Sequence, residues 1–118
     1  MEKTQNISVT GVRIKPTNTI DITSHSQYWY KCAFTFDSTW NNLKKTAVFT
    51  NDKKTYAAQT LADDNTCYIP ASVLTSHGYL YIGVIHSLAV TDNLIEKLPT
   101  EWAVITIREG VNTGTALP

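Results

Sequence analysis

Apolar and polar residues alternate along much of this chain, and that alternation predicts β-strands. The clearest stretch is residues 30–36, where every second residue is aromatic or Cys: Tyr30, Cys32, Phe34 and Phe36. Successive side chains of a strand point to opposite faces, so this pattern predicts a strand with one buried face. Residues 102–108 follow the same period of two and predict the last strand of the fold.

The first strand is interrupted by a change of phase at Gly11. Ile7 and Val9 share one phase, whereas Val12 and Ile14 share the other. One extra residue in a strand would return both pairs to the same face. The pattern therefore predicts a β-bulge at Gly11.

Three further strands are predicted in the middle of the chain, at residues 46–50, 55–61 and 66–69. Asn, Asp and Lys fill the first break, at 51–54, and Asp and Asn fill the second, at 63–65. Asp and Asn tolerate left-handed backbone angles and favour turns. We therefore expect an antiparallel meander of three strands.

The segment from Tyr79 to Ser87 is apolar on both of its faces, as expected of a strand in the middle of a sheet. Gly83 interrupts it and predicts either a bulge or the close approach of another backbone.

Helical signals are short. Trp40 and Leu43 lie three residues apart in 38–43, and Pro70 opens 70–74, so each segment predicts a single helical turn. Residues 92–98 fit a helix or a loop equally well. Six or seven strands without a helix of ordinary length predict an all-β protein, either an antiparallel sandwich or a small barrel.

Composition narrows the classes of function. The chain has 118 residues, with ten basic and ten acidic side chains and a formal net charge of zero. Binding to nucleic acid requires clustered Lys and Arg, so no nucleic-acid partner is expected. The polar N-terminus has no signal-peptide pattern, and no apolar run is long enough to span a membrane. We expect synthesis in a cytoplasm and no membrane partner.

The C-terminal residues have the composition of a linker. After Glu109 the chain is rich in Gly and Thr and finishes with Pro118. We therefore expect one domain over residues 1–110, followed by a linker at 111–118 that leads to a further region.

The two cysteines lie in strand-like patterns. In a reducing compartment they are expected to be reduced thiols of the core. The alternative is a disulfide between two sheets with Trp40 packed against it, as in antibody domains. That alternative would link Cys32 to Cys67.

Residues that could carry chemistry are scattered. The three histidines have no spacing typical of metal ligands: His25, His77 and His86. Adjacent strand residues point to opposite faces, so His86 and Ser87 do not form a base and nucleophile pair. The pair Asp63 and Asp64 is better explained as a turn. We expect no catalytic residue, no metal site and no cofactor.

Aromatic residues offer one alternative function. Tyr28, Trp29 and Tyr30 are consecutive, so at least one of them faces outward if the strand is regular. An exposed ring there predicts either a sugar-binding platform or packing at an edge or interface. The remaining large rings are expected in the core: Phe34, Phe36, Trp40, Phe49 and Trp102.

An ordered series of segments resembles a known family. The segments are 34–49, 67–74, 78–84, 98–102 and 109–110. Together they resemble the N-terminal module of minor structural proteins of phages that infect Gram-positive bacteria, found in baseplate, tail-fibre and head-fibre proteins. The resemblance covers residues 7 to 110. It points to these fold-defining positions: Phe34, Phe36, Trp40, Leu43, Phe49, Cys67, Pro70, Gly83 and Trp102.

The resemblance implies an antiparallel, immunoglobulin-like β-sandwich of about seven strands. Such a module anchors a fibre or receptor-binding part to the virion through contacts with other phage structural proteins, and is expected to form homo-oligomers there. The segment 87–97 departs from the family pattern as a longer insert. We expect an interaction surface that combines residues of this insert with the outward-facing aromatic residues: Tyr28, Trp29, Ser87, Asp92 and Asn93.

Two other functions remain open at this stage. One is a carbohydrate-binding module that contacts a host cell-wall polysaccharide through Trp29 and its neighbours. The other is a small phage-encoded inhibitor of a host protein.

Overall fold

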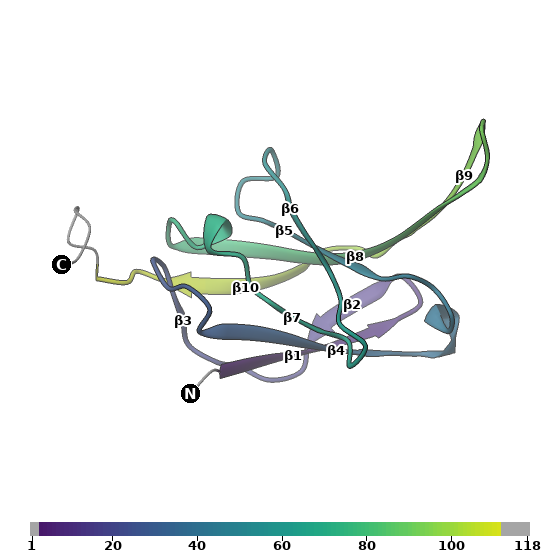
Figure 1. Ribbon diagram of the computed structural model, residues 1–118. Helices are drawn as coiled ribbons and strands as arrows, with labels where there is room; N and C mark the ends of the chain where they lie inside the picture. The colour runs from purple at the N-terminus through teal and green to yellow at the C-terminus, as the bar shows by residue number, and fades with distance from the viewer. Residues whose placement is uncertain (1–2, 112–118) are drawn as a thin grey trace.

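The computed structural model describes residues 3–111, which form an all-β protein with two single turns of 3₁₀ helix (Figure 1). The elements are β1 (Lys3–Thr10), β2 (Arg13–Pro16), β3 (Ile22–Thr23), β4 (Tyr30–Phe36), η1 (Ser38–Trp40), β5 (Thr46–Thr50), β6 (Ala57–Thr60), β7 (Thr66–Tyr68), η2 (Ala71–Val73), β8 (Gly78–Thr91), β9 (Leu94–Pro99) and β10 (Ala103–Arg108). Of the predicted linker at residues 111–118, residues 112–118 lie outside the described residues.

The strands form two sheets. The first has the order β2-β1-β4-β7, and the second has the order β3-β10-β8-β5-β6, with β9 paired to β8. The expectation of purely antiparallel sheets is wrong, because β1 runs parallel to β4 and β3 runs parallel to β10. Each parallel pair joins strands distant in sequence. Alternation shows which face of a strand is buried and does not reveal the direction of its partner.

Gly11 lies in a turn and not in a bulge, which corrects the prediction for the first strand. Thr10 pairs with Arg13, so Gly11 and Val12 form the two-residue connection between β1 and β2. Gly11 has a φ of 59°, a left-handed angle that glycine adopts without steric cost. The change of phase therefore reflects a reversal of the chain.

The predicted three-strand meander is also wrong. β5 and β6 do form an antiparallel hairpin, but β7 pairs with β4 in the other sheet. The chain therefore crosses from one sheet to the other between Thr60 and Thr66. The turn residues at 63–65 were correctly identified, and Asn65 has a φ of 61°.

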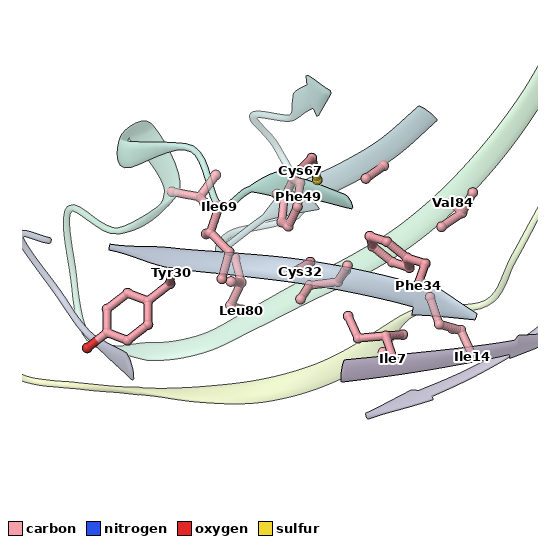
Figure 2. Packing of buried hydrophobic residues seen from close by; sticks show 14 of the residues in the cluster. Ile7, Ile14, Tyr30, Cys32, Phe34, Phe49, Cys67, Ile69, Leu80 and Val84 are labelled. Atoms are coloured by element: carbon pink, nitrogen blue, oxygen red, sulfur yellow. The ribbon is translucent and has the colours of Figure 1, made fainter. Parts of the chain in front are cut away.

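The core lies between the two sheets, and Figure 2 shows part of it. Phe34, Trp40, Phe49 and Cys67 are buried there, whereas Phe36 and Leu43 are partly buried against the same cluster. The following residues complete the buried apolar set: Ile7, Val9, Ile14, Ile22, Tyr30, Cys32, Ala47, Ile69, Val73, Leu74, Leu80, Ile82, Val84, Ala103 and Ile107.

Trp40 closes one end of this core. Its side chain is fully buried, and its indole Nε1 donates a 2.8 Å hydrogen bond to the carbonyl oxygen of Gly11. Its ring lies 5.6 Å from that of Phe36, centroid to centroid. The predicted helical turn at this position is confirmed as η1, and the turn after Pro70 is confirmed as η2.

Cys32 and Cys67 are opposite each other on β4 and β7, and both are free and buried. The alternative of a disulfide between sheets is wrong, because both residues belong to one sheet. Burial raises the pKa of the Cys67 thiol to about 12, and burial together with the neighbouring Cys67 raises the pKa of Cys32. Desolvation disfavours the thiolate, so both groups are neutral thiols at physiological pH.

β8 is the central strand of the second sheet, as its two apolar faces predicted, with β10 on one side and β5 on the other. Gly83 makes room for a side chain and not for another backbone. A Cβ atom added to Gly83 would lie 3.3 Å from two ring carbons of Trp102. Trp102 therefore lies against the outer face of the sheet, 37% exposed, which corrects its assignment to the core.

Candidate functional site

The most prominent feature outside the sandwich is a long β-hairpin made of β8 and β9. The two strands pair from Ile85 and Pro99 to Thr91 and Leu94, with an irregularity between residues 89 and 91. Asp92 and Asn93 form its turn. Figure 1 shows the hairpin extending away from the two sheets. We call residues 87–97 the hairpin arm. Neither the helix nor the loop considered for residues 92–98 is correct.

The hairpin arm carries apolar side chains that the sandwich does not cover. Four of them are more than half exposed: Leu88 (53%), Val90 (53%), Leu94 (57%) and Ile95 (56%). Leu88 is opposite Glu96 and Ile95 is opposite Ala89, so the four side chains occupy both faces of the arm. Single exposed apolar residues are ordinary, but several on one short protruding element indicate a surface that meets another molecule. The arm is therefore the strongest candidate for a contact site.

Polar contacts of the buried His86 hold the base of the arm against the sandwich. His86 is 4% exposed. Its Nδ1 lies 3.1 Å from the carbonyl oxygen of Lys44, and its Nε2 lies 3.2 Å from Oε1 of Glu96. Leu98 packs against the core beside it. These contacts link β8, β9 and the segment before β5, so the direction of the arm is set by the fold.

The outer edge of β9 presents unpaired backbone groups. In the described residues β9 pairs with β8 alone. The N–H of Thr100 donates to the carbonyl of Val84, and hydrogen-bonded positions alternate along an antiparallel pair. The backbone groups of Ile95 and Lys97 therefore point away from β8. Lys97 and Pro99 on this edge oppose unrestricted strand addition, a common protection of exposed edges.

A second surface is the outer face of the larger sheet. The ring of Trp102 lies near that of Tyr56, with centroids 6.2 Å apart and planes 16° from parallel. On neighbouring strands, Tyr79 is 62% exposed and Val104 is 46% exposed. A hollow of about 260 Å³ beside Trp102 has mostly apolar walls, which include Val48, Tyr56, Ile85 and Pro99.

A third feature is a groove of about 540 Å³ on the open side of the sandwich. It lies between β6 and β7, which are the edge strands of the two sheets. Tyr28 and Tyr68 line it, and their rings meet at 89° with centroids 5.8 Å apart. The walls also include the following polar residues: Lys31, Gln59, Thr60, Thr66 and Ser72.

The structure does not bring the five predicted interaction residues together. Ser87, Asp92 and Asn93 are exposed on the hairpin arm. Tyr28 and Trp29 lie at the other end of the sandwich, where the Trp29 carbonyl accepts a hydrogen bond from Lys3 at the start of β1. At the far end of the β1–β2 hairpin, the Val12 carbonyl accepts from Glu101, close to β9. The predicted surface is therefore two separate surfaces.

Several exposed residues were missed from the sequence. Leu88, Val90, Leu94 and Ile95 carry the apolar surface of the arm, whereas only the polar residues of that segment were predicted to make contacts. Part of their signal was present in the apolar run 88–90, which continues past the predicted end of the central strand. Tyr56 gave no such signal, because a single aromatic residue next to a turn is common.

Within residues 3–111, no three side chains among His, Cys, Asp and Glu gather in a way that could hold a metal ion. His25 and His77 are exposed. Over the same residues, no helix has the length and apolar character needed to cross a membrane.

Comparisons with known proteins returned no relatives. No protein-family model matches the chain, and no curated protein is similar to it at a significant level.

Proposed function

We propose that this chain is a non-catalytic structural module of a phage virion, which anchors a fibre or receptor-binding part through protein–protein contacts. The observation that carries the proposal is the hairpin arm, a protruding element with exposed apolar side chains and a base fixed by buried contacts. A rigid apolar projection suits insertion into a neighbouring subunit, where its apolar area is removed from water.

The proposal includes an immunoglobulin-like arrangement of the strands. One sheet contains the order β5-β8-β10, which corresponds to strands C, F and G of an immunoglobulin domain. The other sheet pairs β4 with β7, which corresponds to strands B and E. The parallel pairing of β1 with β4 and the extension of β8 into the arm depart from that pattern. The arm is then an elaboration of the F–G connection.

The partners proposed are other structural proteins of the particle, including further copies of this chain, and the location is the virion assembled in the bacterial host. The low proportion of charged residues, 17%, favours packed interfaces over steering by long-range electrostatics. The outer face around Trp102 and Tyr56 offers a second contact surface for an assembly of several subunits.

The test is immunogold labelling of purified particles with an antibody raised against this chain. We expect label at one defined place on the particle. Because assembly can bury epitopes, dissociated particles are labelled in parallel. Reaction with the cell lysate, together with no label on intact and dissociated particles, would contradict the proposal and favour a soluble inhibitor of a host protein.

A pair of variants tests the role of the arm. Replacing Leu94 and Ile95 with Ser removes apolar contact area without touching the core, so the isolated chain is expected to fold normally and to be lost from particles. Val12→Ser is the matched control, because Val12 is similarly exposed, at 50%, but lies outside the arm. Normal incorporation of the double variant would show that the arm is not the anchor.

A further inference from the structure

We infer that the groove between β6 and β7 is a binding site for a hexopyranose unit of a neutral glycan. This inference does not rest on the virion proposal, because it concerns a different surface from the hairpin arm. The groove has a volume of about 540 Å³, within the range of small-molecule sites in proteins. Its walls combine aromatic rings with hydrogen-bonding groups that are neutral apart from Lys31, and this is the chemistry that a sugar ring requires.

The aromatic corner of the groove is fixed by its neighbours. Tyr28 and Tyr68 meet at nearly a right angle, and the ammonium group of Lys31 lies 5.5 Å from the centre of the Tyr68 ring. The two rings are 70% and 38% exposed. A pyranose has a C–H face that can lie on one ring while the edge of the sugar meets the other, so the corner offers two contacts to one unit.

The backbone at Tyr28 supports a role for its ring. Tyr28 has a φ of 55°, which is uncommon for a residue with a bulky side chain. Its ring is mostly exposed, so burial of the ring contributes little free energy to offset the strain of this backbone angle. Strained residues of this kind cluster at functional sites, where the fold holds a side chain in place for a ligand.

Hydrogen-bonding groups surround the aromatic corner. Gln59 is opposite Ala47, whose side chain is fully buried, so Gln59 points to the inner side of edge strand β6. Thr60 and Ser72 line the same groove and are exposed. An amide both donates and accepts, as does a hydroxyl, and this dual capacity matches the hydroxyl groups of a sugar. Lys31 also lines the groove, with its ammonium group over the Tyr68 ring. The other hydrogen-bonding side chains of the walls are neutral, which suits the hydroxyl groups of an uncharged glycan.

The site differs from the sugar platform considered at Trp29. Trp29 is 44% exposed but does not line the groove, whereas its neighbour Tyr28 does. The two residues therefore provide a matched pair of variants. Tyr28→Ala removes a ring from the groove, and Trp29→Ala removes the exposed ring of the next residue, which does not line it.

The experiment is an NMR titration of the chain with methyl glycosides of glucose, galactose, N-acetylglucosamine and rhamnose. Each sugar is raised to about 50 mM, a concentration that detects binding free energies as weak as about −2 kcal/mol. We expect at least one sugar to shift the signals of the Tyr28 ring and the Gln59 side-chain amide. Tyr28→Ala is expected to weaken that binding about fivefold, and Trp29→Ala to leave it within about twofold.

The outcomes separate the alternatives. If none of the sugars shifts the groove signals, the inference is wrong, whatever the particle labelling shows. Shifts confined to Trp102 and Tyr56 would also overturn it and would move the sugar site to the outer face. Equal losses in both variants would show that binding does not depend on the groove. Unchanged signal dispersion in Tyr28→Ala checks that this variant remains folded.

Discussion

Replacing Trp40 with Ala removes the largest buried side chain of the core. The ring is fully buried, packs against Phe36, and donates its indole N–H to the carbonyl of Gly11. Truncation of a buried Trp costs about 3–5 kcal/mol, because the lost transfer free energy adds to the cost of the cavity. The carbonyl of Gly11 also loses its partner. A domain of this size is stable by about 5–15 kcal/mol, so the variant should retain only part of its stability.

Two further variants divide this loss into its parts. Trp40→Phe keeps most of the apolar ring but removes the indole N–H, so it should cost less than Trp40→Ala, with about 1 kcal/mol or more from the broken hydrogen bond. Trp29→Ala, at a ring that is 44% exposed, should change the free energy of unfolding by less than about 1 kcal/mol.

The assay is urea unfolding followed by far-UV circular dichroism, because Trp fluorescence changes with the substitution itself. The free energy of unfolding is compared among the variants at equal denaturant slope. A loss below about 1 kcal/mol in Trp40→Ala would refute the placement of this side chain at the end of the core.

Two other predictions concern titratable groups. Because burial raises the pKa of Cys67 to about 12 and also raises that of Cys32, neither thiol should react with iodoacetamide at about pH 8 in the folded protein. Mass spectrometry should show both labelled in denaturant, and rapid labelling without denaturant would contradict the burial of that thiol. Backbone hydrogen bonds from Thr55 and Lys54 lower the pKa of Asp52 in the folded state. Its charge therefore stabilises the fold above the unfolded-state pKa of about 4, and that contribution is lost as pH falls through the lower folded-state pKa. The difference in unfolding free energy between the native chain and Asp52→Asn should be largest near neutral pH and shrink below about pH 4. Asp63→Asn serves as the control, since the Asp63 carboxylate accepts no hydrogen bond from residues 3–111. If the difference in unfolding free energy for Asp52→Asn did not change with pH, the hydrogen bonds assigned to the Asp52 carboxylate would be contradicted.

Local pattern was sufficient to identify most strands of this protein. The strand at 30–36 and the last strand were placed within a residue, because alternation with a period of two is a property of the strand itself. The single helical turns at Ser38–Trp40 and Ala71–Val73 were also identified, since each contains an apolar residue at a helical offset or follows a proline.

Partners of the strands were less predictable. β7 was expected beside β6 but pairs with β4, and β1 pairs in parallel with β4. A short strand with one apolar face can bury that face equally well in either sheet. Its backbone groups can form hydrogen bonds with a parallel or an antiparallel neighbour. The choice depends on the whole core, which local alternation does not encode.

The residues of the candidate surfaces were likewise predictable only in part from the sequence. Tyr28 was predicted at an interaction surface because at least one ring of residues 28–30 had to face outward, but its contact with Tyr68 joins residues forty positions apart and required the fold. Trp102 was placed in the core because large rings are usually buried, and only the space above Gly83 explains its position on the outer face.

The sequence by itself determined that this is an all-β protein, which residues alternate, and that the chain turns at 51–54 and 63–65, because these depend on backbone angles and on neighbours within a few positions. The tertiary structure alone decided which strands share a sheet, that β8 and β9 continue beyond the sandwich as an arm, and which aromatic rings meet. Those features arise from packing between distant segments, where burial of one side chain is fixed by many others at once.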